Sequence, residues 1–187
     1  LKVNKPIRAF VFDAYGTLFD VNSAARSLQD ELGTRWQPLA ELWRTKQLQY
    51  TWLRGLGGHH ADFWTVTSDA LSFAFDTLKI QDPELHRRLM TLYLSLNVYL
   101  DVIDALKKLK AGGMSLAILS NGTPQMLASA AAHSGIADLL DAVLSVEEVG
   151  VFKPHPSVYK LASDRLQLAP ERICFLSSNG WDAYAAK

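Results

Sequence analysis

Short apolar segments that alternate with helical patterns constrain the fold of this chain more than any other feature. Each segment is rich in aliphatic or aromatic residues and is followed at once by polar and glycine-containing sequence, as is typical of buried parallel strands. The predicted strands are residues 7–12, 115–119 and 173–176, with a fourth at 142–145. Helical periodicity precedes each of the three strands after the first, at residues 101–111, 124–133 and 156–166. Strands connected through helices form parallel sheets, so the pattern predicts an α/β fold with a Rossmann-like doubly wound parallel sheet.

Residues 21–97 differ from the rest of the chain because they contain no convincing strand pattern. Helical periodicity runs through most of this interval, and the predicted helices are residues 39–55, 61–78 and 83–96. A helical block inserted directly after the first strand is placed to cover the sheet edge where ligands bind. We therefore predict a Rossmann-like core made of residues 1–20 and 98–187, with an inserted helical cap subdomain at residues 21–97.

Composition and charge argue against several classes of protein. The 19 basic and 19 acidic residues cancel, which argues against a surface that binds nucleic acid or another polyanion. No apolar run is long enough to cross a bilayer, and the N-terminus has no signal-peptide core, so we expect a cytoplasmic protein without a membrane partner. The single cysteine, Cys174, excludes an internal disulfide, and its apolar neighbours predict a buried, inert thiol.

Polar side chains follow the predicted strands at the points where the strands end. Asp13 ends the first strand, Ser120 and Asn121 follow the second, and Ser177 and Asn179 follow the third. Ser120 or Ser177 by itself is more readily explained as a cap of a turn or helix. The carboxyl ends of parallel strands meet at one edge of a sheet, where α/β proteins bind their ligands. The joint occurrence of these side chains therefore indicates a functional site.

Asp13 can be explained equally well as a capping residue or as a covalent nucleophile. Lys153 lies on the loop that enters the predicted helix 156–166, and a nearby ammonium group favours an ionised carboxylate. A carboxylate held among hydrogen-bond donors, with one side open, can attack an electrophile. The residues alone leave both explanations open.

Four motifs resemble those of the haloacid dehalogenase superfamily in order and spacing: "FDAYGT" with Asp13, "LSNG" with Ser120, "FKPHP" with Lys153, and "SSNGWD" with Asn179. The resemblance covers the whole chain and implies a cap inserted after the first strand. Most members of the superfamily are magnesium-dependent phosphatases whose first motif reads Asp-x-Asp, and the second aspartate protonates the leaving alcohol. Tyr15 occupies that position here, so the chain resembles the (S)-2-haloacid dehalogenases, whose halide leaving group needs no proton.

The resemblance implies hydrolysis of a short (S)-2-haloacid to an (R)-2-hydroxy acid, through an ester on Asp13 and without metal or other cofactor. A hard dication prefers several anionic oxygen ligands, and Asp13 and Asp182 form a poor metal site when Lys153 competes for both. Two other functions stay open, namely a magnesium-dependent phosphatase of the same superfamily and a non-catalytic binding protein on the same scaffold.

The resemblance also implies a site, residue by residue. The implied catalytic residues are Asp13, Thr17, Arg44, Ser120, Lys153, Tyr159, Ser177, Asn179 and Asp182. The implied substrate-binding residues are Ala14, Tyr15, Arg44, Leu48, Phe63, Ser120, Asn121 and Trp181. No metal ligand is among them.

Within the implied catalytic set, Lys153 orients Asp13 and keeps it ionised, with Asp182 as the partner of the lysine. Three residues are implied to hydrogen-bond Asp13 or the hydrolytic water: Thr17, Ser177 and Asn179. Tyr159 matches the position of a supporting tyrosine near the lysine, although a core aromatic residue on the helix 156–166 explains it equally well.

The implied substrate pocket combines polar and apolar side chains. Arg44, helped by Asn121, is implied to stabilise the departing halide, whereas an isolated helical arginine would pair with Glu41 or Asp20. The group implied to hold the substrate carboxylate is Ser120 with backbone amides near Ala14, Tyr15 and Asn121. Four residues are implied as an apolar wall, although such residues are more often part of a core: Tyr15, Leu48, Phe63 and Trp181.

The expected partners are few. The resemblance implies a small 2-haloacid substrate, and neither nucleic acid nor a membrane is expected to bind. Relatives are often dimers through the cap, and the apolar helix at residues 39–53 suits either a homodimer interface or an intramolecular core. Relatives continue beyond the position of Lys187 with at least one more strand and helix, so the C-terminal part of the core is expected to be missing.

Overall fold

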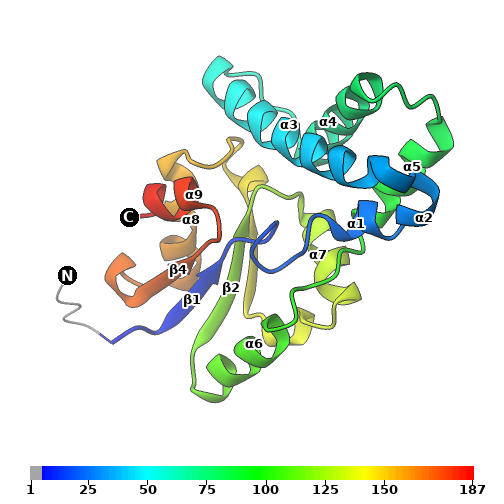
Figure 1. The fold of residues 1–187 in the computed structure, drawn as a ribbon. Coiled ribbons are helices and arrows are strands. Elements are labelled where there is room, and N and C mark those ends of the chain that lie inside the picture. The colour runs from blue at the N-terminus through cyan, green and yellow to red at the C-terminus, as the bar shows by residue number, and fades with distance from the viewer. Residues whose placement is uncertain (1–5) are drawn as a thin grey trace.

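A four-stranded parallel sheet forms the centre of the computed structural model, which describes residues 6–187 (Figure 1). The strands are β1 (Ala9–Phe12), β2 (Ser115–Ser120), β3 (Ala142–Ser145) and β4 (Ile173–Leu176). Their order across the sheet is β3-β2-β1-β4, and all neighbouring pairs are parallel. The chain therefore leaves β1 toward β2 and β3 and then returns across the sheet to β4, which confirms the doubly wound α/β fold.

The register of the strands brings their carboxyl ends to the same edge of the sheet, with β2 and β3 extending two residues beyond β1 and β4. Phe12 at the end of β1 pairs with Ile118 on β2 and with Leu176 on β4. The residue after each strand end therefore enters the same edge of the sheet. This edge faces the helices that follow β1 in Figure 1.

Four helices cover the two faces of the sheet. They are α6 (Val102–Ala111), α7 (Pro124–His133), α8 (Pro156–Leu166) and α9 (Gly180–Ala185). Figure 1 shows α6 and α7 on one face and α8 and α9 on the other, as right-handed crossovers require for this strand order. The start of α7 follows from its sequence, because the Thr123 side chain accepts a hydrogen bond from the Met126 amide and Pro124 occupies the first turn.

A second group of helices lies between β1 and α6. Its members are α1 (Ser23–Arg26), α2 (Gln29–Leu32), α3 (Trp36–Gly57), α4 (Phe63–Thr77) and α5 (Pro83–Leu92). The long helices α3 and α4 pack against each other above the carboxyl edge of the sheet (Figure 1). The chain enters and leaves this group side by side, because the Asp20 amide donates to Asn97 O and the Tyr99 amide donates to Leu18 O.

Short 3₁₀ turns connect the remaining elements. They are η1 (Gly33–Arg35), η2 (Ala137–Leu139), η3 (Val146–Glu148) and η4 (Pro170–Arg172). No helix within residues 6–187 is both long and apolar enough to cross a membrane.

Several local predictions differ from the structure, mostly at the ends of elements. The first strand begins at Ala9 and not at residue 7, and α5 ends at Leu92 because residues 93–95 close successive tight turns back onto it. Residues 1–5 of the predicted core lie outside the described residues. The strand β4 is only partly buried because it forms one edge of the described sheet. Cys174 on β4 is accordingly half-buried, and this burial raises the pKa of its thiol.

Asp141 links the sheet to α6 and offers a test of pH-dependent stability. Its carboxylate accepts hydrogen bonds from Lys110 Nζ at 2.5 Å and from the Leu116 amide at 2.8 Å, and these bonds lower the pKa of Asp141. A lowered folded-state pKa contributes stability above the unfolded-state pKa, and this contribution is lost as the pH falls through the folded-state pKa.

We therefore expect Asp141→Asn to lower the melting temperature by about 2 °C at pH 7, with the difference from the unmodified chain shrinking below about pH 4. Thermal unfolding by circular dichroism at several pH values measures this. Asp138→Asn, at an exposed position three residues away, is the control. An equal loss for Asp141→Asn at pH 3 and pH 7 would contradict the ionic origin of the effect.

Candidate active site

Asp13 is held at the carboxyl end of β1 by three donors from separate parts of the chain. Its Oδ2 accepts from Thr17 Oγ1 at 3.0 Å and from Asn179 Nδ2 at 2.9 Å, and its Oδ1 lies 3.1 Å from Lys153 Nζ. The Asp13 amide donates to Leu176 O, which continues the ladder between β1 and β4. Only 7% of the residue is exposed. The carboxylate is thus oriented by its neighbours and does not cap a helix or turn.

Lys153 is almost completely buried between two carboxylates. Its Nζ is 3.1 Å from Asp13 Oδ1 and 2.9 Å from Asp182 Oδ2, and it lies 5.0 Å from the centroid of the Phe175 ring. The residue is 1% exposed and Asp182 is fully buried. A buried ammonium requires such compensation. The structure therefore brings Lys153 to Asp13 and Asp182, as predicted.

Tyr159 on α8 completes this cluster. Its hydroxyl donates to Asp182 Oδ1 at 2.7 Å, so Asp182 bridges the tyrosine and the lysine. Burial, followed by the hydrogen bond to Asp182, raises the pKa of Tyr159 strongly. The phenol is therefore neutral and acts as a donor that orients Asp182.

The turn after β1 is joined to the turn after β4. Gly16 has a φ of +93°, a conformation that glycine adopts without the steric cost of a side chain. The Ser178 side chain donates to Gly16 O at 2.5 Å, and the Ser178 amide donates to Thr17 Oγ1 at 3.0 Å. Sequence reasoning missed Ser178, although the two adjacent serines of "SSN" were the available signal.

Of the two contacts predicted for Ser177, the one to Asp13 is not formed, and the one to the hydrolytic water stays a prediction. Its Oγ accepts a hydrogen bond from the Asn179 amide at 3.1 Å, and within the described residues it makes no hydrogen bond to Asp13. The cause is the direction of the strand end, which turns Ser177 toward the start of α9. Ser177 positions Asn179, and Asn179 contacts Asp13 directly.

The loop after β2 presents unused donors to the same edge of the sheet. Ser120 Oγ is fully buried and accepts from the Gly122 amide at 3.1 Å, so its own proton stays available. Asn121 Oδ1 accepts from the Lys153 amide at 3.0 Å, which leaves the Asn121 NH₂ group free to donate. Within residues 6–187, the backbone N–H groups of Ala14, Tyr15 and Asn121 donate to no acceptor. These groups suit an anionic ligand.

Arg44 reaches the site from α3. Its Nη2 donates to Tyr15 O at 2.7 Å and its Nη1 donates to Gln47 Oε1 at 2.8 Å. The alternative pairing with Glu41 or Asp20 is wrong, because Asp20 pairs with Arg26 at 2.7 Å and the ion pairs of the described residues include neither Arg44 nor Glu41. The structure therefore directs the guanidinium to the sheet edge and not to solvent partners.

A small pocket collects these side chains. Its ten lining residues are Asp13, Tyr15, Arg44, Leu48, Phe63, Ser120, Asn121, Lys153, Asn179 and Trp181. All the side chains predicted to bind substrate are among them except that of Ala14, which is fully buried beside Asp13. The pocket is thus lined by both the Asp13 carboxylate and the Arg44 guanidinium, with apolar and aromatic residues as its walls.

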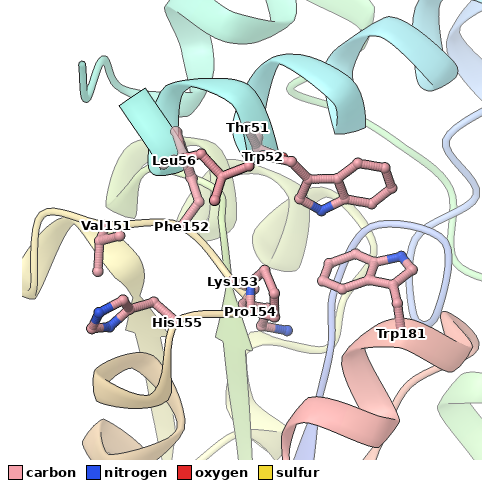
Figure 2. Close-up of a pocket in the computed structure, with 10 residues that line it drawn as sticks. Thr51, Trp52, Leu56, Val151, Phe152, Lys153, Pro154, His155 and Trp181 are labelled. Atoms are coloured by element: carbon pink, nitrogen blue, oxygen red, sulfur yellow. The ribbon is translucent and has the colours of Figure 1, made fainter. Parts of the chain in front are cut away.

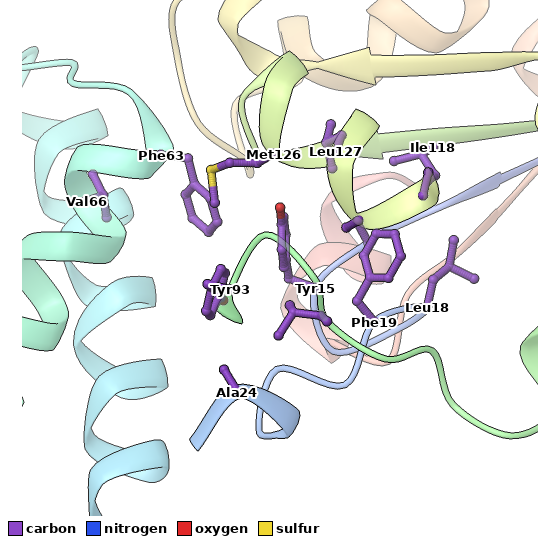
Figure 3. Close-up of a cluster of buried hydrophobic side chains, with 14 of the residues drawn as sticks. Tyr15, Leu18, Phe19, Ala24, Phe63, Val66, Tyr93, Ile118, Met126 and Leu127 are labelled. Carbon is purple, nitrogen blue, oxygen red and sulfur yellow. The ribbon is translucent and has the colours of Figure 1, made fainter. Parts of the chain in front are cut away.

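The Tyr15 ring forms part of an apolar cluster between the carboxyl edge of the sheet and the helices α3 and α4 (Figure 3). It stacks on Tyr93 with centroids 5.5 Å apart and contacts Phe63 at 5.3 Å. Its hydroxyl is buried without a hydrogen-bond partner in the described residues, and burial holds the pKa of Tyr15 well above its usual value. Tyr15 is therefore a wall and a poor proton donor.

A larger apolar hollow of about 390 Å³ adjoins the pocket and shares Lys153 and Trp181 with it (Figure 2). Trp52 from α3 meets Trp181 from α9 edge to face, with centroids 5.4 Å apart. Neither Asp13 nor Arg44 lines this hollow. The polar chemistry is therefore confined to the small pocket.

The site does not suit a divalent metal ion. Among residues 6–187, no group of three or more histidine, cysteine, aspartate or glutamate side chains is arranged to hold one. The two carboxylates that could do so are both bound by the Lys153 ammonium, which supplies the positive charge in that place.

Comparison with known proteins gives a consistent result. Residues 7–187 match the family model of haloacid dehalogenase-like hydrolases. The (S)-2-haloacid dehalogenase 1 of Pseudomonas sp. (strain CBS-3) is 45% identical over 95% of this chain and 78% of its own length. The (S)-2-haloacid dehalogenase 4A of Burkholderia cepacia is 46% identical over 94% of this chain and 77% of its own.

A solved structure with a covalently bound ligand shows the same similarity. The L-2-haloacid dehalogenase of Xanthobacter autotrophicus with chloropropionic acid covalently bound superposes with a TM-score of 0.89 at 42% identity. The match covers 96% of this chain and 73% of that chain.

Proposed function

The chain belongs to the haloacid dehalogenase-like hydrolases and, within them, to the (S)-2-haloacid dehalogenases, and we propose that it hydrolyses short (S)-2-haloalkanoic acids to (R)-2-hydroxyalkanoic acids and halide. One observation carries this proposal. Asp13 is held by Lys153, Thr17 and Asn179. Two residues later the chain carries Tyr15, whose phenol has no hydrogen-bond partner in the described residues. Among the described residues that line the pocket, Asp13 is the one carboxylate, so the pocket offers no second acid to protonate a leaving group, which suits one that departs as an anion.

In the first step, an Asp13 oxygen attacks C2 of the substrate from the side opposite the halogen. The new O–C2 bond forms as the C2–halogen bond breaks, and the halide departs with the bonding electrons and with inversion at C2. Oδ1 is the better attacking atom, because Oδ2 already accepts two hydrogen bonds. Ser120 and the unused backbone amides of Ala14, Tyr15 and Asn121 bind the substrate carboxylate, and the free NH₂ group of Asn121 helps Arg44 to stabilise the halide.

In the second step, water adds to the carbonyl carbon of the aspartyl ester. Thr17 and Asn179 then donate to the oxygen on which negative charge develops, and the surrounding protein excludes bulk water from these bonds. Collapse of the intermediate restores the Asp13 carboxylate with one oxygen from water. The hydroxy acid takes one hydrogen from that water, and the other is released as a proton.

Arg44 stabilises the departing halide in this scheme, so its replacement offers a direct prediction. We expect Arg44→Lys to lower the turnover rate about 100-fold or more, because an ammonium cannot donate to Tyr15 O and Gln47 and still present planar N–H groups to the halide. Chloride release from (S)-2-chloropropionate measures the loss. Arg54→Lys, on the same helix but paired with Asp69, is the control and keeps its rate. Full turnover by Arg44→Lys would remove this role.

The reaction is metal-independent because Lys153 neutralises the carboxylates that would otherwise bind a dication. The deciding experiment compares resolved 2-chloropropionate enantiomers with 4-nitrophenyl phosphate, each with and without chelator. Chelator-insensitive chloride release from the (S) enantiomer supports the proposal. Chelator-sensitive phosphate release would favour a phosphatase, and a thermal shift with 2-chloropropionate but no turnover would favour a binding protein.

We further propose that residues 21–97 act as a cap on the core formed by residues 1–20 and 98–187. The hydrogen bonds that pair residues 18–20 with residues 97–99 support these boundaries, since they close the base of the inserted segment. We propose a homodimer through α3, where Leu53 and Leu56 are exposed. A cytoplasmic location is also proposed, in agreement with the free thiol of Cys174.

A further inference from the structure

A buried polar cluster lies behind Arg44, on the side away from the reaction pocket. It consists of Gln47 on α3, Thr67 on α4 and Tyr93 just after α5. Gln47 is 1% exposed and Thr67 is fully buried, which is unusual for polar residues in the middle of helices. None of these three residues lines the reaction pocket. Their hydrogen bonds therefore need an explanation other than contact with substrate.

The hydrogen bonds of Thr67 determine which way the Gln47 amide points. Thr67 Oγ1 donates its only proton to Phe63 O at 2.6 Å, so toward Gln47 it acts as an acceptor. Gln47 Nε2 donates to this oxygen at 2.7 Å. The carbonyl Oε1 must then face the other way, where Arg44 Nη1 donates to it at 2.8 Å. The amide cannot flip without losing both bonds.

Tyr93 closes the cluster and keeps it dry. Its hydroxyl lies 3.0 Å from Gln47 Nε2 and 3.1 Å from Gln47 Oε1, and its ring stacks on Tyr15 in the apolar cluster (Figure 3). The Trp43 indole covers Tyr93 with ring centroids 5.0 Å apart. A hydrogen bond excluded from water in this way resists replacement by solvent.

Arg44 is consequently held at two points. Nη1 is bound by Gln47, and Nη2 is bound by Tyr15 O, on the turn that carries Asp13. Within the described residues, these two hydrogen bonds use two of the five guanidinium N–H groups, and the others lie in the same fixed plane. Without this support, rotation about the side-chain bonds of the arginine would let its guanidinium group occupy several positions.

We propose that Gln47 is a positioning residue that fixes the guanidinium plane of Arg44 toward the departing halide, with Thr67 fixing the Gln47 amide in turn. This inference rests on the proposed dehalogenase function. It extends the site beyond the side chains that touch substrate, from the reaction pocket through Gln47 to the contact between α3 and α4.

The test compares Gln47→Met, which keeps side-chain length and removes both polar atoms, with Thr51→Val as a matched control. Thr51 is fully buried on α3 one turn after Gln47, and its hydroxyl bonds only to Leu48 O within the described residues. We expect Gln47→Met to lower kcat/KM about 10- to 100-fold, as is common when the residue orienting a functional side chain is removed. Thr51→Val keeps kcat/KM near that of the unmodified chain.

The ratio of kcat/KM for a chlorinated substrate to kcat/KM for a brominated one distinguishes a positioning role from a structural role. The value of kcat/KM reports the displacement step. Chloride leaves less readily than bromide, so the departure of chloride depends more on stabilisation by Arg44. We expect Gln47→Met to lower kcat/KM more for (S)-2-chloropropionate than for (S)-2-bromopropionate. Thr67→Val shifts the ratio in the same direction and Thr67→Ser restores it. An unchanged ratio in Gln47→Met, even with a lower melting temperature, overturns the proposal.

Crystal structures of the same variants supply a readout that does not depend on turnover. In Gln47→Met we expect the Arg44 guanidinium to leave Tyr15 O, whereas in Thr51→Val it stays. Retention of the Arg44 position in Gln47→Met overturns the positioning role, whatever the enzyme acts on. Failure of the unmodified chain to release halide, with Arg44 displaced in Gln47→Met, instead contradicts only the proposed function.

Discussion

Replacement of Asp13 by asparagine is expected to lower the rate of halide release about 10⁴-fold or more, because the variant loses the atom that forms the bond to C2. The change is nearly isosteric, and the remaining amide oxygen can still accept either from Lys153 Nζ or from Thr17 Oγ1, which bind different oxygens of Asp13. Chloride release from (S)-2-chloropropionate measures the loss. Asp20→Asn is the matched control, since Asp20 is a similarly buried carboxylate seven residues later, and its partner is Arg26.

Isotope labelling distinguishes an aspartyl ester from direct attack by water. In a single turnover in heavy-oxygen water, the label is expected to enter the Asp13 carboxylate, because water adds to the ester carbonyl. Mass spectrometry of the peptide containing residue 13 detects it. Label found in the hydroxy acid alone would show that Asp13 acts as a base toward water, and the covalent scheme would be abandoned.

Replacement of Lys153 by methionine is expected to have the largest combined effect on activity and stability. The two buried carboxylates of Asp13 and Asp182 would then share no cation, and breaking a buried ion pair from one side typically costs about 3–5 kcal/mol. For a chain of this size, the melting temperature should fall by about 10 °C. Turnover should fall about 10³-fold or more, because Asp13 loses one of the three donors that orient it.

A double variant separates the two effects. Lys153→Met combined with Asp182→Asn removes one of the uncompensated charges, while the new amide oxygen can still accept from the Tyr159 hydroxyl. We expect most of the melting temperature to return and the activity to stay low. If activity returned together with stability, the role of Lys153 would be structural and the orientation of Asp13 would not depend on it.

The elements of the core could be predicted from the sequence to within a few residues. Burial on both faces produces continuous apolar runs in parallel strands, and Thr123 with Pro124 marks a helix start by local chemistry alone. We predict the end of α5 too late, because apolar residues continue at helical spacing to Leu96, whereas the backbone at residues 93–95 closes tighter turns onto the helix. The local pattern thus predicts the elements themselves better than their ends.

The site was predicted less evenly. Asp13 and Asn179 follow directly from the strand ends, whereas the role of Ser178 does not, because the direction of the turn decides which serine hydroxyl faces Thr17. Gln47 could not be found at all, since a glutamine in a helix resembles a solvent-exposed residue until the neighbouring helix covers it.

By itself, the sequence determined the doubly wound sheet and the acid at the end of β1, because alternating periodicities and strand-end residues act over short stretches of chain. Only the tertiary structure decided that the Lys153 ammonium lies between Asp13 and Asp182 and that Arg44 reaches Tyr15 O, since these contacts join residues 29 to 140 positions apart. The physical reason is burial. Charged and polar groups removed from water must find partners wherever packing places them, and packing is a property of the whole fold.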